Sequence, residues 1–128
     1  MSYTITISEN EKYIICRVTG VMTVEIAQET AREMDKLSHA KNIRRFLTDV
    51  RGAPNISSAN QNYKYANQDM KGLKLQRGVR SAILVDPADT THDFVETAVM
   101  NAGYNVRVFR DERAAIAWLN EETSSQEA

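Results

Sequence analysis

The sequence predicts a single α/β domain, with elements in the order β-β-α-β-α-β-α-β-α and a mixed, mainly parallel five-stranded sheet flanked by helices. Strand-like and helix-like periodicities alternate from the second strand onward, which favours parallel strands joined by right-handed crossovers. The 128 residues are 42% hydrophobic and 26% charged, as is typical of one globular domain. We expect that domain to cover residues 1–122, and the small, polar residues 123–128 to form a disordered tail.

An antiparallel hairpin is expected first. Tyr3, Ile5 and Ile7 alternate with threonines, which is the period of a half-buried strand. The β-branched and aromatic run Tyr13–Thr19 predicts a second strand. Because the polar segment between them is short, the two strands should pair as a hairpin.

A helix and a third strand follow. Thr23 is a candidate N-cap. Apolar residues then recur every three or four positions, at Val24, Ala27, Ala31, Met34 and Leu37. Residues Arg45–Val50 predict the strand.

The next segment carries the apolar spacing of a second helix. Its apolar positions keep a 3,4,3,4,3 spacing, at Ile56, Ala59, Tyr63, Ala66, Met70 and Leu73. Tyr65 falls on the opposite, amide-rich face, whose low charge is typical of a partner surface. The basic stretch Met70–Arg80 carries Lys71, Lys74, Arg77 and Arg80, which would either be solvated or bind an anionic group.

The rest of the chain repeats the alternation. Val79–Val85 is nearly continuously apolar, as expected of a strand covered on both faces. Asp89 is a candidate cap for a third helix, and Val106–Phe109 predicts a short last strand. Asp111 is a candidate cap for the final helix, whose buried side is expected to hold Ala115, Ile116, Trp118 and Leu119.

Charge and cysteine content narrow the function classes. Sixteen basic and seventeen acidic side chains leave a net charge of −1, so no general attraction to nucleic acid or anionic lipid is expected. No apolar run approaches 18 residues and no signal peptide is recognisable, so we expect neither a membrane span nor export. Cys16 is the only cysteine, which excludes an internal disulfide and favours the cytoplasm.

Two serines before the second helix allow two interpretations. Ser58 and Gln61 have the spacing of a capping box, a purely structural role. Ser57 or Ser58 could instead accept a phosphoryl group, whose negative charge would suit a helix N-terminus.

Acidic residues gather where parallel strands should end. Asp49, Asp86 and Asp111 all lie at or just after such ends, where open α/β sheets bind ligands. Asp49, Arg51 and Asp86 are therefore a candidate strand-end pocket, and carboxylates there could hold Mg²⁺. Each carboxylate also has an ordinary explanation, as a helix cap, a turn residue, or a partner of Arg51 or Arg45.

Catalytic motifs are absent from the sequence. His39 and His92 are expected on the surface, and Cys16 is expected to be a small core residue. There is no glycine-rich phosphate loop, no nucleophile elbow and no metal-spaced Cys/His set. We therefore expect no enzyme activity, no cofactor and no metal site.

Three stretches resemble a known group: FLTDVRGA at Phe46–Ala53, AILVDP at Ala82–Pro87 and NVRVFRDERAAIAWL at Asn105–Leu119. With the element order, they make the chain similar to the STAS-like group of bacterial anti-sigma-factor antagonists, and especially to its SpoIIAA-like branch, whose fold is related to CRAL-TRIO lipid-binding domains. In the regulatory members the turn into the second helix reads Asp-Ser-Ser-Gly, and a partner kinase phosphorylates a serine there. Here that turn reads ISSA at residues 56–59, so both serines match and both flanking residues differ.

The resemblance implies a non-enzymatic cytoplasmic module that binds an unknown protein partner through the second helix and the loop before it. A homodimer could form through the hairpin edge or the amide-rich helix. The alternative is a carrier of a small apolar or lipid-like ligand in a CRAL-TRIO-like pocket between the second and third helices. A metal-dependent enzyme using Asp49 and Asp86 is the third hypothesis.

Overall fold

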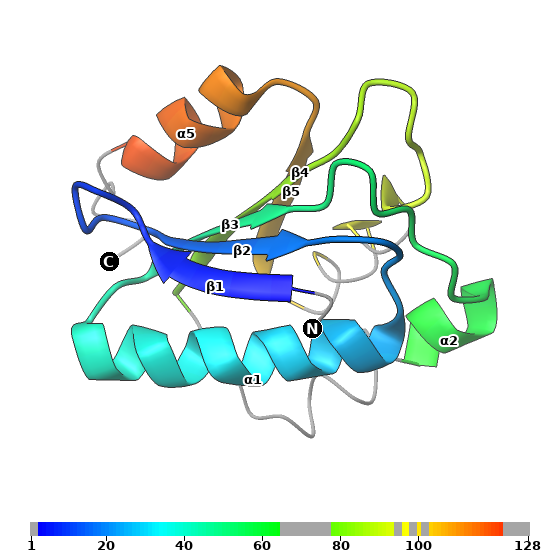
Figure 1. Cartoon of the computed structure of the whole chain (residues 1–128), viewed down its shortest axis with the longest axis horizontal. Helices are drawn as coiled ribbons and strands as arrows, with labels where there is room; N and C mark the ends of the chain where they lie inside the picture. The colour runs from blue at the N-terminus through cyan, green and yellow to red at the C-terminus, as the bar shows by residue number, and fades with distance from the viewer. Residues whose placement is uncertain (1–2, 65–77, 94–95, 98–99, 101–102, 122–128) are drawn as a thin grey trace.

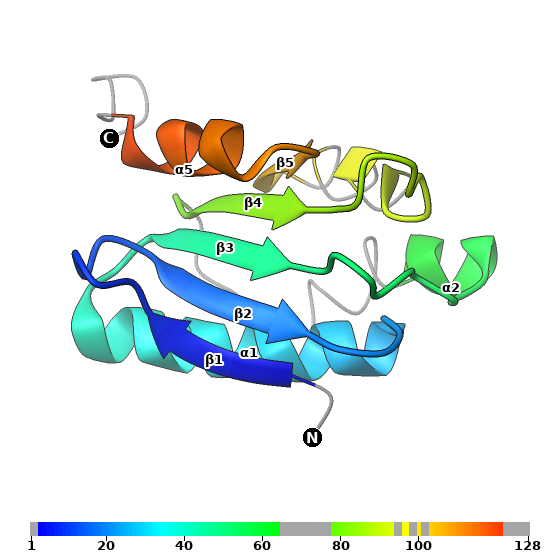
Figure 2. The same cartoon turned by 45° about the horizontal axis from the view of Figure 1, so that its top comes forward.

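A single five-stranded sheet, ordered β1-β2-β3-β4-β5, organises the chain. Helix α1 covers one face of this sheet and α5 the other (Figures 1 and 2). The computed structural model describes residues 3–64, 78–93, 96–97, 100 and 103–121. The strands are β1 (Tyr3–Ile7), β2 (Ile14–Val18), β3 (Arg45–Asp49), β4 (Arg80–Leu84) and β5 (Asn105–Phe109). The helices are α1 (Val24–Lys41), α2 (Ala59–Lys64) and α5 (Glu112–Asn120), and described residues between β4 and β5 are also helical.

Strand pairing confirms the expected mixed sheet. β1 runs antiparallel to β2, in a register from Tyr3 opposite Val18 to Ile7 opposite Ile14. The three remaining pairs, β2 with β3, β3 with β4 and β4 with β5, are all parallel. Parallel neighbours need crossover connections, and α1 supplies the one between β2 and β3.

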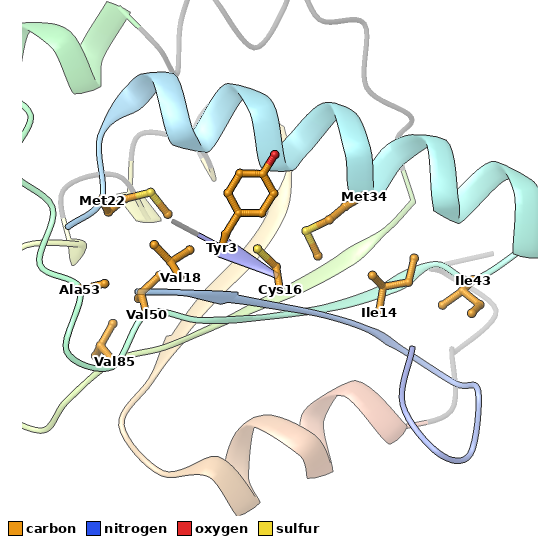
Figure 3. Close-up of a cluster of buried hydrophobic side chains, with 10 residues drawn as sticks. All are labelled: Tyr3, Ile14, Cys16, Val18, Met22, Met34, Ile43, Val50, Ala53 and Val85. Atoms are coloured by element: carbon orange, nitrogen blue, oxygen red, sulfur yellow. The ribbon is translucent and has the colours of Figure 1, made fainter. Parts of the chain in front are cut away.

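The larger apolar core lies between the sheet and α1 (Figure 3). Ile14 and Cys16 of β2 are completely buried there, beside Met34 of α1. Burial raises the pKa of the Cys16 thiol to about 12, with the negative charge of Glu33 acting in the same direction. The thiol therefore stays protonated at neutral pH, which confirms Cys16 as a core residue.

Helix α1 begins as expected and packs its predicted apolar face on the core, with Met34 buried and Ala27 and Leu37 partly buried against the same cluster. The Thr23 hydroxyl accepts a hydrogen bond from the Ile26 N–H at 3.2 Å, so the predicted cap is confirmed. The buried residues of the helix are Thr30, Met34 and Ser38, whereas Ala31 is only half-buried. Two polar residues can lie there because Thr30 Oγ1 donates to the Ala27 carbonyl, and Ser38 Oγ donates to the Ile43 carbonyl.

A smaller core lies between the sheet and α5. It consists of Leu47, Ala82, Leu84, Ala115 and Leu119. Asp111 caps α5 as expected, since its carboxylate accepts a hydrogen bond from the Ala114 N–H at 3.3 Å. Within the described residues, none of the helices combines the length and the hydropathy that a membrane span requires.

Candidate functional site at the carboxyl ends of the strands

Three loops meet where the parallel strands end. The Met22 N–H donates to the Pro54 carbonyl (2.9 Å), and the Ile56 N–H donates back to the Met22 carbonyl (3.0 Å), which makes a parallel bridge between the loops after β2 and β3. The Asn55 N–H donates to Thr91 Oγ1 (2.9 Å) and so connects the loop after β4. We call these the carboxyl-edge loops; they comprise residues 19–23, 50–58 and 85–92.

Both candidate serines make structural hydrogen bonds in these loops. The Ser58 N–H donates to the Gln61 side chain (2.7 Å) and the Gln61 N–H donates to Ser58 Oγ (3.1 Å), so the predicted capping box is present. Ser57 Oγ accepts from the Val24 N–H at 3.0 Å, at the first residue of α1. Local sequence patterns carry no signal for this contact, because the two residues are 33 positions apart.

The Asp49 carboxylate lies in an ion-pair network with two arginines. It accepts two hydrogen bonds from the Arg51 guanidinium, at 3.0 and 2.8 Å, and lies 3.5 Å from Arg17 Nε. Arg51 also approaches Glu112 at 3.5 Å, whereas the other predicted partner, Arg45, donates to the Leu119 carbonyl at 3.2 Å. Burial alone would raise the pKa of Asp49, but the hydrogen bonds and positive charges of the arginines outweigh it and lower the pKa overall.

Asp49 should therefore contribute to stability in a pH-dependent way. A lowered carboxyl pKa adds stability above the pKa of the unfolded chain, about 4, and this is lost as the pH falls through the native pKa. We expect Asp49→Asn to reduce the free energy of unfolding by about 1–2 kcal/mol at pH 7, and progressively less below about pH 4. Urea denaturation across this pH range measures the effect. Glu9→Gln, in the exposed hairpin turn, is the control, and an Asp49→Asn deficit that persists undiminished in acid contradicts the assignment.

Asp86 lies at the same edge of the sheet, where its carboxylate binds a backbone N–H group. One carboxylate oxygen accepts a hydrogen bond from the Gly52 N–H at 2.6 Å. The hydrogen bonds to Asp49 raise the pKa of Arg51 most, and the negative charge of Asp86 acts in the same direction. The structure thus brings together the three predicted pocket residues, Asp49, Arg51 and Asp86. Among the residues described, no group of three or more His, Cys, Asp or Glu side chains could hold a metal ion.

His92 is buried, and its predicted surface position is wrong. The residue is only 4% exposed, and its Nε2 lies 3.1 Å from the Ala53 carbonyl oxygen and 3.7 Å from Asp89. Asp89 is not a simple helix cap either, because its carboxylate accepts hydrogen bonds from the N–H and hydroxyl of Thr91. His39, by contrast, is exposed on α1 as expected, 3.5 Å from Asp35.

Two exposed apolar side chains flank the bridge between the loops. Val21 and Ile56 are 40% and 61% exposed, and the third large exposed apolar residue in the described part is Met100. Because side chains alternate along paired backbones, Val21 and Ile56 both project opposite to the buried Met22. The prediction that Ile56 opens the buried face of a helix is therefore wrong, since α2 begins only at Ala59.

Comparison with known proteins identifies the fold. No protein-family model matches the sequence, and no curated protein matches it. A DUF3478-family protein from Shewanella loihica PV-4, described as having a SpoIIAA-like fold, is 21% identical over 91% of each chain, with a TM-score of 0.52. The anti-sigma factor antagonist SpoIIAA in its unphosphorylated form is 13% identical over 94% of this chain and 99% of its own, also with a TM-score of 0.52. The chain has a SpoIIAA-like fold.

This SpoIIAA-like fold confirms the resemblance drawn from the sequence. In this structure the two-serine turn lies at the entry to α2, within the carboxyl-edge loops. Four residues predicted to form a partner or ligand surface, Tyr65, Lys71, Lys74 and Arg77, lie outside the described residues. The same holds for most of the predicted lining of a carrier pocket, so both surfaces stay predictions.

Proposed function

We propose that this chain is a non-enzymatic, cytoplasmic STAS-like module that regulates another protein by binding it. The observation that carries the proposal is the apolar pair Val21 and Ile56, exposed beside Ser57 and Ser58 on the carboxyl-edge loops. Apolar side chains on a backbone already fixed by hydrogen bonds lose little conformational freedom when a partner covers them. The lone, protonated thiol of Cys16 suits a reducing compartment.

The two serines give this surface a means of regulation. A phosphoryl group on Ser57 would lie at the N-terminus of the 18-residue helix α1, next to the Val24 N–H. It would also add negative charge beside Val21 and Ile56 and so disfavour an apolar partner there. The solved relative described as unphosphorylated SpoIIAA supports this reading for a chain of the same fold.

Binding is tested by capture from cells that express the chain. We expect Val21→Glu or Ile56→Glu to abolish enrichment of a protein that the unchanged chain retains. Met100→Glu, at an exposed apolar residue outside these loops, should retain it. Equal capture by Ile56→Glu and by the unchanged chain would refute the proposed surface.

Phosphorylation is tested on the same material by mass spectrometry. Trypsin should release residues 52–64, which contain both serines, and fragmentation assigns a phosphoryl group to Ser57 or Ser58. Ser57→Ala should cost about 1 kcal/mol of stability, because the Val24 N–H loses its acceptor, whereas Ser57→Asp should restore most of it. If Ser57→Asp binds the captured protein as tightly as Ser57→Ala does, the regulatory role fails.

A further inference from the structure

We propose that two copies of this chain pair through β1, joining their sheets into one. Among the strands of the described residues, β1 lies at the edge of the sheet and pairs with β2 alone (Figure 2). An edge strand presents a row of N–H and C=O groups on its outer side, and these can form a ladder with another strand. The hydrogen bonds and the composition of this chain favour β1 as the edge that pairs, and they favour β1 of a second copy as the strand that pairs with it.

The ladder with β2 shows which backbone groups face outward. The Ser8 N–H donates to the Tyr13 carbonyl at 2.9 Å, which continues the register of the hairpin by one pair. In an antiparallel pair, alternate residues direct both backbone groups towards the neighbouring strand. Thr4 and Thr6 share the phase of Ser8, so Tyr3, Ile5 and Ile7 direct their N–H and C=O groups away from β2.

This outward row is complementary to itself. When a second β1 runs antiparallel with Ile5 opposite Ile5, each Tyr3 lies opposite an Ile7 of the other copy. Every outward N–H then meets an outward carbonyl, as a two-fold symmetric interface requires. On the exposed side of the strand, each Thr4 lies opposite a Thr6, a favourable pair across antiparallel strands.

The two edges of the sheet differ in how well they are protected against pairing with a strand of another molecule. β1 reads YTITI, with no charge, proline or glycine, and so lacks the common side-chain features that discourage pairing at an edge. At the opposite edge, the outward Val108 N–H of β5 donates to the Glu96 carboxylate, and β5 carries the charged Arg107. A second copy is therefore expected at β1 and not at β5.

Charge substitution at the exposed threonines tests the pairing. Five residue pairs make a small interface, so we expect weak dimerisation. In sedimentation experiments the unchanged chain should be monomeric at low concentration and shift towards a dimer only as its concentration approaches about 1 mM. The double variant Thr4→Lys with Thr6→Lys places like charges opposite each other and should weaken pairing about ten-fold or more. The double variant Thr4→Glu with Thr6→Glu should do the same, whereas an equimolar mixture of the two should recover a heterodimer. Asn105→Lys, on the exposed side of β5, is the matched control and should pair like the unchanged chain.

Amide hydrogen exchange gives an independent readout of the register. The Ile5 amide should exchange more slowly as concentration rises, whereas the Thr6 amide, already bonded to β2, should not change. Recovery of the heterodimer also shows that both charged variants are folded. The proposal is overturned if the unchanged chain stays monomeric at about 1 mM, or if the lysine variant dimerises as well as the unchanged chain.

Discussion

Replacing Ile14 with alanine should lower the free energy of unfolding by about 2–5 kcal/mol. Ile14 is completely buried on β2, in the core that α1 covers, and it pairs with both β1 and β3. Its truncation removes apolar area from the core and leaves a cavity that neighbouring strands cannot easily fill. The loss is a large share of the total stability of a domain this size, and urea denaturation monitored by circular dichroism measures it.

The matched control for this change is Ile56→Ala. The substitution is chemically identical, but Ile56 is 61% exposed, so its truncation should alter stability by no more than about 0.5 kcal/mol. Similar losses for the two variants would contradict the exposure of Ile56, and with it the proposed partner surface. Ile56→Ala should instead weaken capture of a partner while leaving the fold intact.

Arg80→Met should cost about 2–3 kcal/mol, because it removes charged hydrogen bonds from a buried site. Arg80 is only 4% exposed, and its Nη1 donates to the Trp118 carbonyl at 2.8 Å near the C-terminus of α5. Its guanidinium also lies 5.2 Å from the centre of the Trp118 ring. A positive group here satisfies the terminal carbonyls and opposes the negative end of the helix dipole.

Two further variants separate charge from geometry at this site. Arg80→Lys keeps the charge but loses the planar group over Trp118, so its stability should fall between those of the unchanged chain and Arg80→Met. Arg113→Met, on the exposed side of α5, should change stability by no more than about 0.5 kcal/mol. Thermal unfolding compares the three variants, and equal losses for Arg80→Met and Arg113→Met would disprove the capping role.

Local signals in the sequence predicted most of the fold. The caps Thr23, Ser58 and Asp111 could be identified because their hydrogen bonds lie within three residues along the chain. The alternation in β1 and the connection lengths then indicated the hairpin and the parallel strands. These features depend on interactions between residues that are close along the chain, so the order of residues in a single sequence is enough to indicate them.

The site was predictable only in part, because its contacts join distant segments. The position of Asp49 at a strand end and its pairing with Arg51 followed from two neighbouring residues. The burial of His92 against Ala53, and the bond from Val24 to Ser57, depend on how separate loops meet. Ile56 was misassigned because its spacing continued a helical pattern, although the loop bridge to Met22 holds it outside α2.

The order of the strands also bears on how the chain folds during synthesis. Each strand lies beside the one made just before it, so every new strand finds its neighbour already outside the ribosome. Helix α5 reaches back to β3 and β4, where Arg45 and Arg80 donate hydrogen bonds to the carbonyls near its C-terminus. The sheet can therefore form from the N-terminus one strand at a time, and the final helix then packs on the face opposite α1.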